Sequence, residues 1–249
     1  MQIDNIAQKD SGKRMRKGLI KLIFLLAWVP SFSQKQDSVL QATYQQANQQ
    51  FKQGQYAEAL PGLSNLILAG FPKKEIYLTR GAAYYHLGEF DKAKADLDEA
   101  VKARITTAEL FELRGNSRYH LDDYAGVVAD LEKAISLGAA SFDLFSNLGN
   151  AKFQIGNYKE AIQNYDKAIG LNAKDATLFN NRGKSKFTLG NLTDALPDFD
   201  QALVLKPGYT KALENRAEAY YELKNWKKAE SDFERIIAQL PALRQYFAP

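Results

Sequence analysis

Residues 142–175 read FDLFSNLGNAKFQIGNYKEAIQNYDKAIGLNAKD, and residues 176–209 read ATLFNNRGKSKFTLGNLTDALPDFDQALVLKPGY. Placed one under the other, the two stretches agree in position after position, and the agreement extends in both directions. Six rows of 34 residues align without a gap, as 40–73, 74–107, 108–141, 142–175, 176–209 and 210–243. A chain that repeats at this period predicts a structure that repeats in space.

Small residues and aromatics set the register, because each kind recurs in the same column, that is, at the same position within a row. Column 8 holds Ala47, Gly81, Gly115, Gly149, Gly183 and Ala217. Column 12 holds Phe51, Tyr85, Tyr119, Phe153, Phe187 and Tyr221. Aromatics make up 12% of the chain, so six aromatics in one column arise by chance with odds on the order of one in ten thousand.

Each row predicts two helices, since apolar and small residues recur at spacings of three and four. A turn carrying Gly54, Gly88, Gly156 or Gly190 separates the two helices. In rows three to six the residue after the turn is a predicted N-cap of the second helix, namely Asp123, Asn157, Asn191 and Asn225. Asn157 and Glu160 also have the spacing of a capping box. Glycine inside a helix costs roughly 1 kcal/mol against alanine, so column 8 predicts that another helix passes too close for a side chain.

The pattern resembles the tetratricopeptide repeat, a helix-turn-helix unit of 34 residues. The residues that carry the resemblance are Phe145, Leu148, Gly149, Gly156, Tyr158, Ala161, Tyr165 and Ala168 and their counterparts in rows two to six, while row one fits more loosely. The resemblance implies an all-α fold, a right-handed superhelical α-solenoid of antiparallel helix pairs.

Two charged columns vary together. Column 7 is Arg80, Arg114, Arg182 and Arg216 in rows two, three, five and six, and column 23 of the same rows is Asp96, Asp130, Asp198 and Asp232. Rows one and four lack both partners, with Gln46 and Gly62 in one and Leu148 and Asn164 in the other. The columns therefore predict partly buried arginine–aspartate pairs that join the two helices of a row. Solvated charges that coincide by accident are the alternative.

The segment from Met15 to Gln34 has the features of a secretory signal peptide. Arg16 and Lys17 precede an apolar run from Leu19 to Val29, and small residues follow it up to Ser33. We expect a signal over residues 1–33 with Met15 as an alternative start, a short arm over 34–39, and a tail over 244–249 after the repeats. The apolar run is shorter than the roughly 20 residues that span a bilayer, so no integral membrane span is expected in the mature form. An uncleaved anchor is the alternative.

The charge balance argues against a nucleic-acid partner. Residues 1–33 hold six Lys or Arg and two Asp, which accounts for the whole excess of +4 and leaves 27 basic against 27 acidic residues in the remainder. The basic patch that nucleic-acid binding requires is therefore not predicted. The chain contains no cysteine, so the expected location, periplasmic or secreted, depends on the signal alone.

No motif predicts catalysis, a cofactor or a metal. Gly183-Lys184-Ser185 imitates the end of a phosphate-binding loop, but the glycine required five positions earlier is Leu178 and the triplet lies inside a predicted helix. His86 and His120 share column 13 and are expected as exposed neighbours on the inner face, without a third zinc ligand. The sequence therefore predicts a protein that is not an enzyme.

Family resemblance implies that columns 2, 5, 9, 12 and 13 face a concave groove. From these columns we expect a partner-binding groove formed by Tyr85, Glu109, Glu112, Asn116, Tyr119, Asp143, Asn150, Phe153, Asn180, Lys184, Phe187 and Tyr221. The acids favour a basic partner, and the asparagines suit an extended peptide backbone. The column-12 aromatics either pack between helices or contact the ligand.

These features predict a non-catalytic scaffold or adaptor of the bacterial cell envelope that binds a peptide or helix of a partner protein. A membrane-tethered accessory or assembly subunit, held by an uncleaved N-terminal segment, is the alternative. The last row has no full capping helix after it, so either Tyr246 and Phe247 cover Phe233 and Ile236, or a second copy does so in a homodimer.

Overall fold

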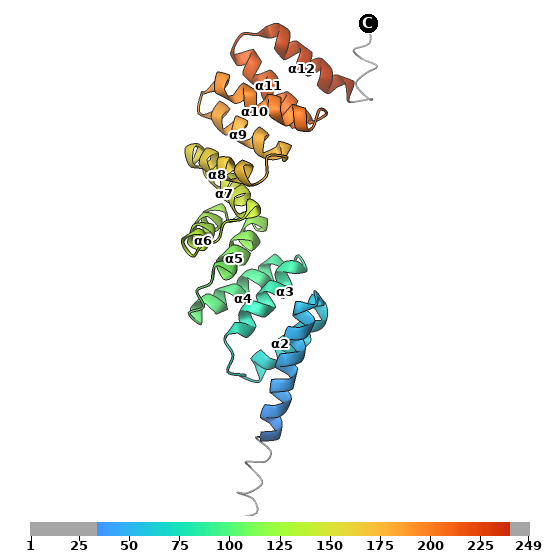
Figure 1. The fold of residues 1–249 in the computed structure, drawn as a ribbon, viewed down its shortest axis with the longest axis vertical. Helices are drawn as coiled ribbons and strands as arrows, with labels where there is room; N and C mark the ends of the chain where they lie inside the picture. The colour runs from blue at the N-terminus through green and yellow to red at the C-terminus, as the bar shows by residue number, and fades with distance from the viewer. Residues whose placement is uncertain (1–33, 240–249) are drawn as a thin grey trace, which may run out of the picture. The chain divides into compact units, whose positions relative to one another are not determined.

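The computed structural model describes residues 34–239. The expected signal peptide, residues 240–243 of the sixth row and the tail over 244–249 lie outside the described residues. The chain divides into two compact units, one ending at Leu87 and the other beginning at Gly88. Each unit is described by itself (Figure 1).

Every described regular element is an α-helix, and the helices keep the period of the sequence. Residues 34–52 form the first helix, which includes the expected arm over 34–39. The others are α2 (Tyr56–Leu68), α3 (Glu75–His86), α4 (Phe90–Lys102), α5 (Ala108–His120), α6 (Tyr124–Ser136), α7 (Phe142–Gln154), α8 (Tyr158–Leu171), α9 (Ala176–Thr188), α10 (Leu192–Leu205), α11 (Thr210–Glu222) and α12 (Trp226–Ala238). The prediction of an all-α chain of antiparallel helix pairs is confirmed.

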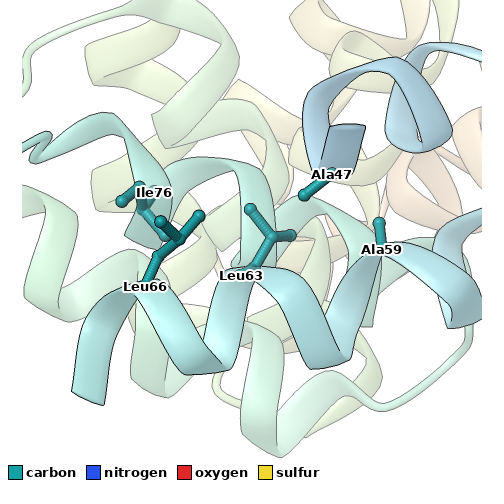
Figure 2. Packing of buried hydrophobic residues seen from close by; sticks show 5 residues of the cluster. All are labelled: Ala47, Ala59, Leu63, Leu66 and Ile76. Carbon is teal, nitrogen blue, oxygen red and sulfur yellow. The ribbon is translucent and has the colours of Figure 1, made fainter. Parts of the chain in front are cut away.

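The first unit has its own apolar core. Ala47 on the first helix, Ala59, Leu63 and Leu66 on α2, and Ile76 on α3 are at most 1% exposed. Figure 2 shows Leu66 and Ile76 meeting side by side, with Leu63 and Ala59 along the same face of α2 below Ala47. The three- and four-residue spacing in the sequence predicts such a face, with about one apolar side chain in each helical turn.

In the second unit the first helices of successive rows form one layer. Helix α5 contacts α7, α7 contacts α9, and α9 contacts α11. Among the described residues of this unit, the second helices α6, α8, α10 and α12 make no comparable contacts with one another. The layer of first helices is the more tightly spaced, and this places it on the concave side.

The column-8 glycines are sites of close helix packing, as predicted. A Cβ atom built on Gly115, Gly149 or Gly183 would lie 2.7 Å from the column-24 side chain of the same row, which is Leu131, Tyr165 or Phe199. Real Cβ atoms do not approach so closely, so glycine lets the second helix lie directly against the first.

The turn between the helices of a row has a left-handed residue in column 15. Glycine occupies it in four rows, for example Gly156 with φ of 83°. Asp122 and Lys224 adopt the same conformation in rows three and six, with φ of 57° and 58°. Glycine meets this requirement without steric cost, which explains the turn glycines of the sequence.

All four predicted N-caps are confirmed in position, and two of them also make a side-chain cap bond. The side chains of Asp123 and Asn225 accept hydrogen bonds from the backbone N–H groups of Gly126 and Lys228. The side chains of Asn157 and Asn191 make no cap bond. The capping box at Asn157 is absent because Glu160 binds Lys152 instead; nothing in the structure explains the difference at Asn191.

The arginine–aspartate prediction is confirmed in rows three, five and six. Arg114 binds Asp130 at 2.5 Å, Arg182 binds Asp198 at 2.5 Å, and Arg216 binds Asp232 at 2.6 Å. The three aspartate side chains are only 3–4% exposed. The pair of Arg80 and Asp96 would join the two units and stays a prediction.

Each arginine also reaches the second helix of the preceding row, in column 25. Arg114 binds Asp98 at 2.9 Å, Arg182 binds Asp166 at 2.6 Å, and Arg216 binds Asp200 at 2.6 Å. In the first unit Arg80 donates to Ser64 Oγ, the column-25 residue of row one, at 3.0 Å. We call the column-7 arginine with its two partners the inter-repeat brace, since one side chain joins three helices.

Row four lacks this arginine and replaces it with a lysine one turn further along the helix. Lys152, which is 6% exposed, binds the column-25 residue Glu132 of row three at 2.7 Å and Glu160 of its own row at 2.5 Å. Burial alone would lower the pKa of Lys152, but the hydrogen bonds that its ammonium group donates to the two carboxylates raise it. Row four therefore keeps the connection between three helices by a different side chain.

Replacing Arg216 with leucine should destabilise the protein, because Asp232 stays buried without its bidentate partner. We expect Arg216→Leu to lower the free energy of unfolding by about 3 kcal/mol. The double variant R216L/D232N copies Leu148 and Asn164 of row four and should recover at least about 1 kcal/mol. Urea denaturation followed by circular dichroism measures both; equal losses in the two variants would contradict the role of the buried charge.

Candidate functional site

A cavity of about 440 Å³ opens on the layer of first helices in the second unit. Helices α7, α9 and α11 supply most of its wall, and Tyr165 of α8 reaches it from the outer layer. The lining residues are Tyr119, Asn150, Phe153, Gln154, Tyr165, Thr177, Asn180, Asn181, Lys184, Tyr209, Lys211 and Asn215. Four of the twelve are asparagines, so we call this the amide cavity.

The four asparagines are joined by hydrogen bonds that cross three repeats. Asn215 donates to the Oδ1 of Asn180 at 2.8 Å, and Asn180 donates to the Oδ1 of Asn181 at 3.1 Å. Asn181 in turn donates to the Oδ1 of Asn150 at 3.0 Å. A connected set of amides is fixed in orientation, because each carbonyl oxygen selects the donor side of its neighbour.

Asn150 ends this chain and receives a second hydrogen bond. The hydroxyl of Tyr165 donates to the same Oδ1 at 2.8 Å. Burial raises the pKa of Tyr165, so its phenol stays protonated and acts as a donor at neutral pH. Within the described residues, the Nδ2 group of Asn150 makes no hydrogen bond, and it is the part of this side chain that a ligand can use.

The column-12 aromatics pack within their own repeat and also line the cavity. Tyr119 meets Tyr124 edge to face at 5.9 Å between ring centroids, and Phe153 meets Tyr158 at 5.2 Å. Tyr119 and Phe153 are only half-buried and are part of the cavity wall. In rows three and four these aromatics therefore both pack within the repeat and line the cavity, and their contact with a ligand stays a prediction.

Charges around the amide cavity are unevenly distributed. Two lysines line the cavity, and each pairs with an acid outside its lining. Lys184 binds Glu218 at 2.9 Å, and Lys211 binds Glu214 at 3.1 Å. These pairs are exposed, so a ligand can displace them at little cost.

A second hollow of about 450 Å³ lies at the start of α5 and the loop after α6. Glu109, Glu112 and Asn116 line it together with apolar and small residues. Glu112 accepts a hydrogen bond from the Ser141 hydroxyl at 2.9 Å. We call this the acidic hollow, since no basic residue is part of its lining.

The structure brings eight of the twelve predicted groove residues to these two places. Tyr119, Asn150, Phe153, Asn180 and Lys184 line the amide cavity, and Glu109, Glu112 and Asn116 line the acidic hollow. Asp143, Phe187 and Tyr221 line neither, and Tyr85 lies in the first unit.

The predicted groove did not include seven of the twelve residues that line the cavity, among them Tyr165, Asn181, Tyr209 and Asn215. Asn181 and Asn215 share column 6 with Asn147, which donates to Asn116 at 3.0 Å. The bonds from Asn147 and Asn181 both reach the column-9 residue 31 positions earlier. A search for amides at this spacing would have found Asn181, whereas Asn215 binds Asn180 across 35 residues.

The two histidines have a role that the sequence did not indicate. His86 stacks on Tyr56 with 4.4 Å between ring centroids, and His120 stacks on Phe90 at 3.9 Å. Each histidine therefore contacts the aromatic that begins the second helix of the preceding row, rather than standing as a free polar group. In residues 34–239 no three potential ligands gather as a metal site.

Within the same range of residues, no helix has the length and apolar character needed to cross a membrane.

Models of the tetratricopeptide repeat family match residues 44–109 and 180–243, and a model of the TPR repeat matches residues 149–190. No curated protein matches the chain.

Solved structures are similar in fold. YrrB, described as a TPR protein with an unusual peptide-binding site, aligns with a TM-score of 0.64 at 23% identity over 74% of this chain and 96% of YrrB. MamA aligns at 0.60 and 22% over 67% and 97% of the two chains. The C-terminal part of a TPR repeat-containing protein from Cytophaga hutchinsonii aligns at 0.62 and 23% over 78% of each.

Removing one cavity aromatic should weaken the fold only moderately. Because Tyr119 and Phe153 are half-buried, we expect Tyr119→Ala and Phe153→Ala each to cost about 1–2 kcal/mol, below the 3–5 kcal/mol typical of a fully buried Phe. Urea denaturation measures the change. An unfolded variant would show that packing is the dominant role of this column.

Proposed function

We propose that this chain, which belongs to the tetratricopeptide repeat family, is a non-catalytic scaffold that binds an extended segment of a partner protein along its first helices. The observation that carries the proposal is the amide cavity, where hydrogen-bonded asparagines from three repeats line one concavity. We place the scaffold in the bacterial cell envelope.

The chemistry of the amide cavity suits a peptide main chain. A peptide presents one N–H donor and one C=O acceptor per residue, and asparagine side chains offer the same two groups. The free Nδ2 of Asn150 complements a main-chain carbonyl. Tyr119 and Phe153 supply apolar area for one partner side chain at low entropic cost, since each has only two side-chain torsions.

The charges favour different side chains at different places on the groove. Glu109 and Glu112 in the acidic hollow complement a basic residue of the partner. The amide cavity has two lysines and no acid in its lining. The basic character expected for the partner therefore belongs at the acidic hollow and not in the amide cavity.

The peptide-binding site named for YrrB agrees with a peptide ligand, although that similarity is one of fold. Export is supported by the pattern of Met15 to Gln34, which lies outside the described residues. An accessory subunit tethered by that segment is the second candidate. N-terminal sequencing of the protein from envelope fractions separates them, since a new N-terminus at Gln34 leaves no tether.

The proposal is tested by selecting peptides from a random twelve-residue display library with the wild-type chain and measuring the affinity of the tightest one by calorimetry. Asn150→Ala should weaken its binding about tenfold, the loss of roughly one hydrogen bond to a ligand. Gln163→Ala, which removes an exposed amide from the outer helix α8, is the matched control. Failure to select any peptide, or equal binding by Asn150→Ala, would refute the proposal.

A further inference from the structure

Tyr165 differs from the other buried residues of its column. Column 24 is Leu63, Leu97, Leu131 and Phe199 in rows one, two, three and five, each 0% exposed, and Tyr165 in row four is 1% exposed. In rows one, three, four and five these side chains face the first helix of their own row from the second. Only Tyr165 among these five carries a hydroxyl group into that position.

The hydroxyl of Tyr165 reaches the cavity because glycine clears the way. A Cβ atom on Gly149 would lie 2.7 Å from Cε1 of the Tyr165 ring. The ring passes α7 at this glycine and ends at Asn150, one residue further along the same helix, where its hydroxyl donates at 2.8 Å. A side chain of the outer helix α8 thus becomes part of the inner surface.

Row five shows that the ring fits without the hydroxyl. Phe199 lies against Gly183 as Tyr165 lies against Gly149, with the same 2.7 Å separation from a built Cβ atom. Packing alone is therefore satisfied by phenylalanine. The hydroxyl of Tyr165 adds one contact, the hydrogen bond to Asn150.

We propose, on the basis of the proposed function, that Tyr165 is a positioning residue that acts on the bound segment through Asn150. Its hydroxyl and the amide of Asn181 occupy the Oδ1 of Asn150 from two sides. The Asn150 amide then has one orientation, with its Nδ2 donors directed at a main-chain carbonyl of the bound segment. Preorganisation of this kind lowers the entropic cost of binding.

Tyr165→Phe tests the proposal with the peptide selected on the wild-type chain. The variant should keep its thermal midpoint within about 5 °C, the shift that roughly 1 kcal/mol causes in a small domain, and should bind several-fold more weakly. Tyr158→Phe removes a phenol hydroxyl from the same helix and should bind as the wild type does.

A double-mutant cycle separates positioning from a general loss of structure. If Tyr165 acts through Asn150, adding Tyr165→Phe to Asn150→Ala should weaken binding no further. Additive losses would overturn the positioning role, as would wild-type affinity in Tyr165→Phe while Asn150→Ala still loses binding. Loss of binding in neither variant would instead refute the proposed function.

One readout needs no ligand. The side-chain amide resonances of Asn150 in a nitrogen–proton NMR spectrum should shift in Tyr165→Phe and stay unchanged in Tyr158→Phe. Unchanged resonances in Tyr165→Phe would overturn the proposal even if no peptide were selected.

Discussion

A buried carboxylate on the second helix of a repeat is the constraint on which the packing of the second unit depends. Asp130, Asp198 and Asp232 are almost fully buried and cannot stay charged there without a cation. Arg118, Lys186 and Arg235 each contact one of these carboxylates, but the column-7 arginine that pairs with each of them also binds the second helix of the preceding row. One electrostatic requirement therefore fixes both the pairing of helices within a repeat and the spacing between repeats.

Row four departs from this arrangement, and the amide cavity lies beside it. Leu148 and Asn164 replace the charged pair, and Lys152 restores the connection to row three from a different place on α7. The same row has the tyrosine of column 24. The column-24 position, which is apolar in the other rows, has thus gained a hydroxyl group here, and that hydroxyl leads from the outer helix to Asn150. The residues that repeat in every row determine the scaffold. The residues of row four that differ from the other rows determine where the surface is chemically distinct.

Much of the fold is readable from the sequence, because a repeat allows one row to be compared with another. The helices, the close packing at Gly115 and the pairing of Arg114 with Asp130 follow from columns that recur, or vary together, within one row. The amide chain does not, since Asn181 binds Asn150 of the preceding row across a step of 31 residues. Tyr165 was missed for a related reason: a buried core position gives no sign that its hydroxyl reaches a residue of the inner helix layer.

The separation of charge along the groove gives the binding surface a direction. Glu109 and Glu112 lie in row three, whereas Lys184 and Lys211 lie in rows five and six. Because the lysines already pair with Glu218 and Glu214, a ligand exchanges one exposed pair for another and gains little free energy there. Affinity must then come from the fixed amides and the two aromatics, and charge sets the direction in which the segment lies. In the proposed binding mode, a segment with its basic residue at the acidic hollow extends its main chain over Asn150, whose orientation depends on both layers of the fold.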